Sequence, residues 1–200
     1  MVCCSWIFLS LCLLLFITPD EGFLQDVTFS QSQRLSMKIL KDVRSLRVLY
    51  NEEQFGGQLI QDSGIVLASL PSASMVYTHW LNMQDEERLA NSSRDLHVYW
   101  VHVHANRMHL LGESEQSQLS QSMLALQMDL SDLTLQVNSQ LWAMNVTLPP
   151  PPAEVLPPEL LSPPSEWLSK LQGSIILRDL ERYLGKVVRD FTLLKSRNQQ

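Results

Sequence analysis

Four histidines in the segment 97–109 are the residues most suited to chemistry, because neutral imidazole is a common zinc ligand. They are His97, His102, His104 and His109. Zinc ligands on one helix stand at i and i+4, where both side chains share a face. No pair of these histidines has that spacing, and His102 and His104 point about 200° apart on a helix. The pattern favours solvated histidines and predicts no metal site.

Acidic pairs are the second candidate, because two carboxylates can share general acid and base roles. Asp129 and Asp132 stand at i and i+3, a spacing that more often marks a solvated helix face than a catalytic pair. The sequence holds no G-x-S-x-G nucleophile motif, no phosphate-binding loop and no dinucleotide fingerprint. We therefore expect no catalytic residue, no bound cofactor and no enzymatic activity.

Two short motifs predict covalent modification. Residues 91–93 (Asn-Ser-Ser) and 145–147 (Asn-Val-Thr) match the acceptor pattern for N-glycosylation. In a secreted chain, Asn91 and Asn145 are then expected to be exposed and glycosylated. Chance occurrence is the alternative, since the pattern is short.

The first 22 residues are predicted to form a secretory signal peptide. Residues 2–17 carry no charge and would span about 24 Å as a helix, short for a hydrocarbon core of about 30 Å. An uncleaved signal anchor is the alternative. Cleavage would leave a domain at 23–200 without disulfides, held together by an apolar core, because every cysteine lies in the leader. The cysteines are Cys3, Cys4 and Cys12.

Charge composition excludes one class of partner. The 200 residues hold 15 basic and 21 acidic side chains, a net charge of −6, whereas nucleic-acid binders are usually basic. Residues 113–166 hold acidic side chains and no basic ones, while basic residues gather at 34–47. This segregation predicts either ion pairs between the first and third helices or a two-toned surface for partners.

Four segments have the apolar periodicity of helices, and none alternates as a strand does. The first is expected from Ser30, where Ser30 and Gln33 form a capping-box pattern, to Phe55. The second runs from about Asn82 to Gly112 and the fourth from Ser165 to Arg197. The third is the clearest, with its apolar stripe at Leu119, Met123, Leu126, Leu130, Leu133, Val137 and Leu141.

The connections predict how these helices are arranged. They are long, short and long, which gives an up-up-down-down bundle, because a long connection lets the next helix run parallel. The proline-rich connector at 145–164 reaches about 60 Å as polyproline, whereas the fourth helix spans about 45 Å. We therefore expect an all-α four-helix bundle at 23–200.

Three passages carry motifs in the order this topology requires. They are Leu70-Pro71 through Trp80 to Asp85-Glu86-Glu87-Arg88-Leu89, Met123 to Leu133, and Ser165-Glu166-Trp167-Leu168 through Leu194. Together they resemble the interleukin-27 alpha subunit family of long-chain helical cytokines, over roughly residues 30–197. The chain departs from that family at its proline-rich connector, which replaces an acidic run, and at Ala90, which replaces a cysteine.

The resemblance implies a secreted signalling protein without catalysis. Such a chain pairs non-covalently with a soluble receptor-like beta subunit, then recruits a specific receptor chain and the shared glycoprotein 130 chain to activate STAT factors. It also implies that Trp80, expected in a loop, contacts the beta subunit. The alternative is a loop aromatic that folds down onto the bundle.

The resemblance further implies that Trp167 and Leu168 contact the shared receptor chain. Trp167 opens the fourth helix after Ser165, a plausible N-cap. Leu168, Leu171 and Ile175 lie off the buried stripe and predict a second apolar patch there. Alternatively, a bend in this helix buries the patch.

Two other functions are alternatives for a chain of this composition. An interleukin-6 or ciliary-factor-like cytokine would act without a beta subunit. An amphipathic lipid-carrying protein would also be helical and cysteine-free, but three distinct connection lengths and a proline-rich connector suit it poorly.

Overall fold

The computed structural model describes residues 21–58, 64–113, 117–147 and 165–198, with the side chains of these residues from 28 onwards, residue 113 excepted. All three cysteines, residues 1–20 of the predicted signal peptide and most of the proline-rich connector lie outside this part of the chain.

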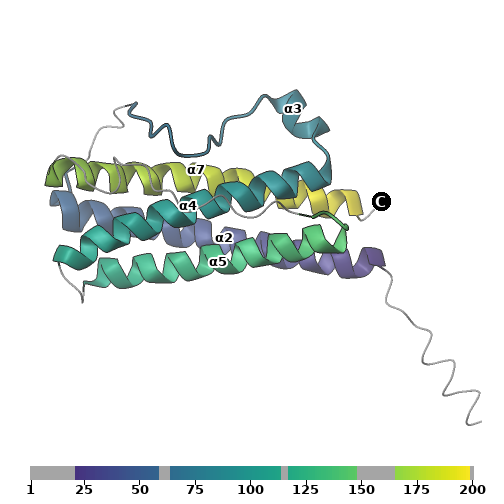
Figure 1. Cartoon of the computed structure of the whole chain (residues 1–200), viewed down its shortest axis with the longest axis horizontal. Helices are drawn as coiled ribbons and strands as arrows, with labels where there is room; N and C mark the ends of the chain where they lie inside the picture. The colour runs from purple at the N-terminus through teal and green to yellow at the C-terminus, as the bar shows by residue number, and fades with distance from the viewer. Residues whose placement is uncertain (1–20, 59–63, 114–116, 148–164, 199–200) are drawn as a thin grey trace, which may run out of the picture.

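Four long helices make up the body of the protein (Figure 1). The described helices are α2 (Glu21–Phe55), α3 (Tyr77–Asn82), α4 (Asp85–Glu113), α5 (Gln118–Ala143) and α7 (Glu166–Asn198). Helices α2 and α4 run one way, and α5 and α7 return, which confirms the predicted up-up-down-down topology. Both α2 and α4 pack against both α5 and α7. Every packed pair is therefore antiparallel.

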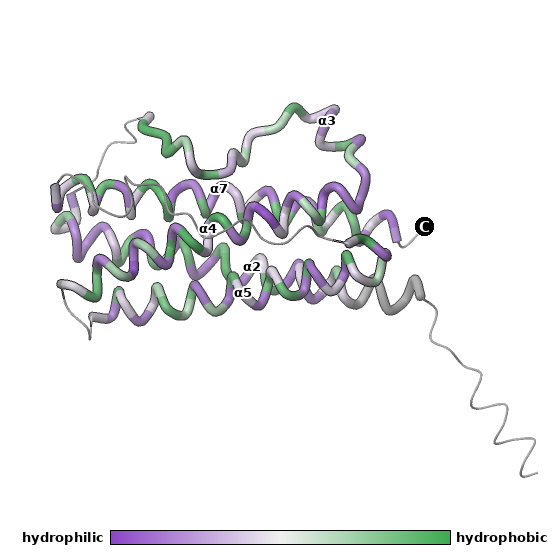
Figure 2. Tube along the Cα trace, viewed as in Figure 1, coloured by the Kyte–Doolittle hydropathy of each residue, from purple (hydrophilic) through white to green (hydrophobic). Residues whose placement is uncertain are grey.

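The core is built from the stripes that the sequence predicted. All seven residues of the α5 stripe are buried, and polar residues separate the apolar ones along each long helix (Figure 2). Leu35 of α2 is only partly buried, whereas the rest of its stripe is buried. The other helices contribute Ile39, Val43, Leu46, Tyr50, Leu89, Leu96, Val103, Leu110, Leu180, Leu184, Val187, Phe191 and Leu194.

The predicted start of the first helix is wrong. Helix α2 begins at Glu21, so Ser30 and Gln33 lie inside it and form no capping box. Instead Gln33 Nε2 donates to Thr192 Oγ1 at 2.7 Å. The extra turns bury Phe29, whose ring centroid lies 6.4 Å from that of Phe191. This long-range packing favours a longer helix than the local motif indicates.

A strap, residues 64–76, connects α2 to α3 and lies along α4 and α7 (Figure 1). Arg178 of α7 donates to the Ile65 carbonyl at 2.8 Å, and Tyr99 of α4 donates to the Pro71 carbonyl at 2.9 Å. The strap leads into the six-residue α3, which the sequence did not predict. Because α3 ends at Asn82, α4 begins later than expected, at Asp85.

Candidate interaction surfaces

Trp80 lies in α3, not in a loop, and its indole folds down onto the bundle. The indole N–H donates to Asp190 Oδ1 of α7 at 2.6 Å. The guanidinium carbon of Arg88 lies 5.2 Å from the indole ring centroid, a cation–π arrangement. Trp80 is half-buried as a result. This is the packing that the alternative for Trp80 described, and it leaves part of the ring accessible.

Beneath Trp80, one carboxylate is shared by two buried cations. Arg88 Nη1 donates to Asp190 Oδ1 at 2.7 Å, and Lys186 Nζ donates to Asp190 Oδ2 at 2.8 Å. These side chains are at most 4% exposed. Lys186 Nζ also lies 5.3 Å from the Tyr183 ring centroid. Buried charges are tolerated when they are paired and hydrogen-bonded in this way.

The outer side of α3 is apolar and accessible. Tyr77 is 67% exposed, and its ring centroid lies 5.9 Å from that of Trp80. Arg197 of α7 fixes the far end of the helix, since its Nη2 donates to the Leu81 carbonyl at 2.7 Å. We call Val76, Tyr77, Trp80 and Leu81 the α3 surface.

The second predicted contact lies at the start of α7. Trp167 is 58% exposed and Leu168 is half-buried. Ser165 caps the helix as predicted, because its Oγ accepts a hydrogen bond from the Leu168 N–H at 3.2 Å. Leu171 and Ile175 are buried, so the predicted second apolar patch is wrong beyond Leu168. The exposed remainder, Trp167 and Leu168, is called the α7 tip.

Leu171 and Ile175 are buried because α7 packs closely against α2 and α4 at this point. A Cβ atom on Gly173 would lie 2.0 Å from the Tyr50 hydroxyl oxygen of α2 and 2.6 Å from the Asn106 amide of α4. Tyr50 in turn donates to the Lys170 carbonyl at 3.1 Å. Glycine therefore allows α7 to approach both neighbours.

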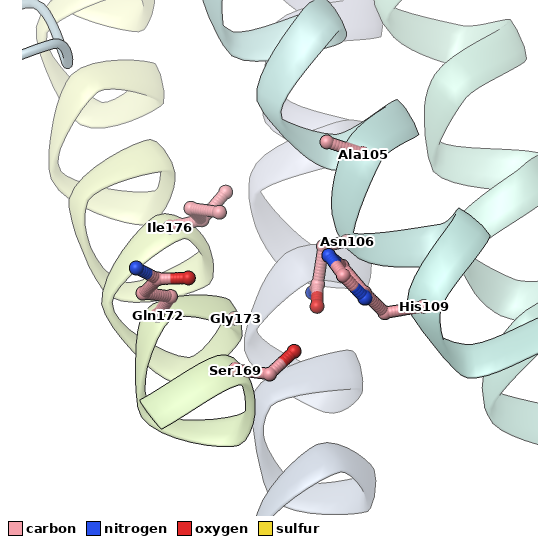
Figure 3. Close-up of a pocket in the computed structure, with 7 residues that line it drawn as sticks. All are labelled: Ala105, Asn106, His109, Ser169, Gln172, Gly173 and Ile176. Carbon is pink, nitrogen blue, oxygen red and sulfur yellow. The ribbon is translucent and has the colours of Figure 1, made fainter. Parts of the chain in front are cut away.

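Figure 3 shows the small cavity beside Gly173, with Asn106, His109 and Ser169 directed toward one another. Its volume of about 10 Å³ is about that needed by one water molecule. Such a space holds no organic ligand or cofactor.

A third surface, missed from the sequence, lies on the outside of α5. Leu124, Met128, Leu135 and Trp142 are exposed there, Trp142 by 75%. Steps of four and seven residues place them on one helix face. The sequence signal was present as a second apolar series beside the buried stripe. We call these four residues the outer α5 stripe.

The two predicted glycosylation sites differ in structure. Asn145 is exposed and has a left-handed backbone (φ 59°) just after α5, where the Val146 N–H donates to the Leu141 carbonyl in a helix-ending motif. Asn91 was expected to be exposed but is half-buried in α4, because it lies close to Met83.

Three of the histidines make contacts within the protein. Trp100 stacks between His97 and His104, with ring centroids 6.2 and 5.4 Å away. His102 is buried and its Nε2 lies 2.9 Å from Ser69 Oγ of the strap. In the described part of the chain, no three His, Cys, Asp or Glu side chains are grouped to hold a metal.

The segregated charges are only partly paired as expected. Lys38 of α2 contacts Asp129 of α5 at 2.6 Å, and this hydrogen bond raises the pKa of Lys38. Arg44 and Arg47, however, pair with Glu181 of α7. Burial opposes ionisation of Glu181, but these arginines hold its pKa below the usual value.

Comparison with known proteins identifies the family to which this chain belongs. A family model described as ciliary neurotrophic factor matches residues 23–200, and no curated protein gives a significant match. Cytokines of this family are secreted, bind receptor chains and are not enzymes. Among the described helices, none is long and apolar enough to cross a membrane. The match confirms the broad cytokine class that the resemblance implied, without confirming the interleukin-27 alpha subunit. The chain is a helical cytokine and belongs to the ciliary neurotrophic factor family.

Proposed function

We propose that the chain is a secreted cytokine subunit that pairs with a soluble receptor-like beta subunit and signals through receptor chains. The observation that carries the proposal is the presence of three separate exposed surfaces on a bundle whose core is already filled. Exposed apolar patches with aromatic anchors are typical of protein interfaces. The predicted signal peptide at 1–22 supports secretion, and Asn145 and Asn91 are the proposed glycosylation sites.

Each surface is assigned one partner in this proposal. Trp80 and the α3 surface bind the beta subunit. Trp167 and Leu168 at the α7 tip bind glycoprotein 130, and the outer α5 stripe binds the specific receptor chain. STAT activation follows from bringing the two receptor chains together.

The positions of the surfaces support simultaneous binding. Trp167 and Asp190, which anchors Trp80, are 23 residues apart on α7, or about 35 Å at 1.5 Å per residue. Partners at the two ends of α7 therefore need not compete for space.

Co-expression tests the proposal. The tagged chain is produced in secreting cells with and without a soluble receptor-like beta subunit, and proteins captured from the medium are identified. Pairing predicts that secretion and STAT phosphorylation in responding cells both rise with the beta subunit. Full secretion and activity of the chain alone would refute the pairing.

A second function is favoured by the family match itself. The match is described as ciliary neurotrophic factor, which supports a cytokine that acts without a beta subunit. In that case the α3 surface binds a receptor chain directly, and the same co-expression experiment identifies that outcome.

A further inference from the structure

Helix α3 has too little apolar contact to hold itself in place. It is six residues long, contains no buried residue and has no side-chain hydrogen bond at its N-cap, Val76. An isolated helix of this length is unstable in water, because nucleation costs more than one turn of hydrogen bonds returns. Its position must therefore come from contacts that the bundle makes with it.

Those contacts are largely polar, and apart from the bond of Arg197 to the Leu81 carbonyl they involve Asp190 and Arg88. Asp190 Oδ1 accepts hydrogen bonds from Trp80 Nε1 and from Arg88 Nη1, at 2.6 and 2.7 Å. Arg88 Nη2 donates to the Trp80 carbonyl and, at 3.4 Å, to the Met83 carbonyl. Arg88 thus bonds both to the backbone of α3 and to the Asp190 carboxylate, which in turn holds the Trp80 side chain.

The chemistry makes the indole N–H the specific part of this attachment. A carboxylate in a dry site binds donors more strongly than a neutral acceptor does. Lys186 occupies the other oxygen, Oδ2, so Trp80 and Arg88 share Oδ1. A phenyl ring at position 80 could cover the same place but could not donate this bond.

We propose that Asp190, with Arg88, is a positioning residue that sets the place of α3 and so presents the α3 surface to its partner. This inference rests on the proposed function, in which that surface binds a partner chain. Asp190 is buried and acts through Trp80, whereas the residues of the α3 surface make the direct contact.

The test is Trp80→Phe in the full chain, measured by amide hydrogen exchange and by binding to the captured partner. The variant removes the N–H donor but leaves Asp190 paired with Arg88 and Lys186, so the bundle stays folded. Losing a hydrogen bond to a charged group predicts roughly 10- to 100-fold faster exchange in α3. The reporting amides are those of Trp80 and Met83, which bond to Val76 and His79.

Amides of α5 provide the internal control and keep their exchange rates, since the bundle is intact. The matched variant is Trp167→Phe, which makes the same chemical change at the other end of α7 and leaves α3 exchange unchanged. Partner binding falls for Trp80→Phe by a similar factor to the exchange effect, because the surface is no longer held. Unchanged exchange in α3 overturns the positioning role.

Tyr77→Ala separates this inference from the proposed function. Removing the Tyr77 ring takes away its packing on Trp80 but leaves the bond from the Trp80 indole N–H to Asp190, so this variant weakens partner binding by a larger factor than it changes exchange at Trp80. Unchanged binding for Tyr77→Ala refutes the partner role of the α3 surface. The exchange result for Trp80→Phe then still decides whether Asp190 positions α3.

Discussion

At the scale of single residues, α7 carries one residue that allows close packing, Gly173, and one exposed aromatic residue, Trp167. Gly173 lacks the Cβ that would collide with Tyr50 and Asn106. Trp167 stands two residues after the N-cap Ser165, whose Oγ accepts from the Leu168 N–H, and its own side chain is largely exposed. The first feature stabilises the bundle and the second is available to a partner, so substitutions there should have opposite consequences.

Gly173→Ala is expected to destabilise the protein by roughly 1–3 kcal/mol, the usual cost of overpacking a core. Alanine favours helix by about 1 kcal/mol over glycine, but a contact at 2.0 Å requires atoms to move and outweighs that gain. Urea unfolding measures the difference. Gly185→Ala in the same helix is the matched control, because the nearest atom lies 4.0 Å from its added Cβ. That control should stabilise by up to about 1 kcal/mol, and equal effects at both glycines would contradict the packing argument.

Trp167→Ala is expected to abolish STAT phosphorylation while changing the free energy of unfolding by no more than about 0.5 kcal/mol, since the side chain is largely exposed. Secretion and pairing with any beta subunit should persist, because the α3 surface lies at the other end of α7. Wild-type signalling potency in this variant would show that the α7 tip is not a receptor contact.

At the scale of elements, the sequence predicts the helices that carry a repeated apolar pattern and misses those too short to show one. The α5 stripe runs over seven positions, so its periodicity specified both the helix and its buried face. Helix α3 has six residues, too few for a period to show. Asp190 bonds to Arg88 and Trp80, which precede it by 102 and 110 positions in the sequence. No local sequence pattern indicates pairs so far apart. The Ser30 cap failed for the same reason, since Phe29 finds its partner on α7.

The strap is an element whose attachment should depend on pH. Burial lowers the pKa of His102 below 6.5, although its hydrogen bond to the Val98 carbonyl opposes the shift. Between the two pKa values the unfolded chain binds a proton that the folded chain does not. The contribution of neutral His102 to stability is therefore complete above about pH 6.5 and is lost as the pH falls toward the folded-state pKa.

Urea unfolding at pH 7.5 and at pH 5.5 measures this effect. The midpoint should fall at the lower pH, and His102→Gln should reduce the difference because glutamine does not titrate. The difference between the two proteins isolates His102 from the other four histidines. An equal pH dependence in both proteins would contradict the assignment.

At the scale of the whole molecule, each long helix serves the core with one face and leaves another for partners. Because all packed pairs are antiparallel neighbours, α5 contacts α2 and α4 and its remaining side faces outward. Leu130 and Leu135 are five residues apart on that helix, one fully buried and the other 61% exposed. Two side chains of the same type therefore have different roles, because one faces the core and the other faces solvent.

Replacing each of these leucines by alanine should separate stability from recognition. Leu130→Ala removes buried methyl groups and leaves a cavity, so it is expected to cost roughly 2–5 kcal/mol in urea unfolding. Leu135→Ala exposes nothing new to solvent and should change stability by no more than about 0.5 kcal/mol. If the outer α5 stripe binds a receptor chain, Leu135→Ala should nevertheless weaken capture of that chain. The interaction role of the stripe fails if Leu135→Ala, together with Trp142→Ala, leaves receptor capture unchanged.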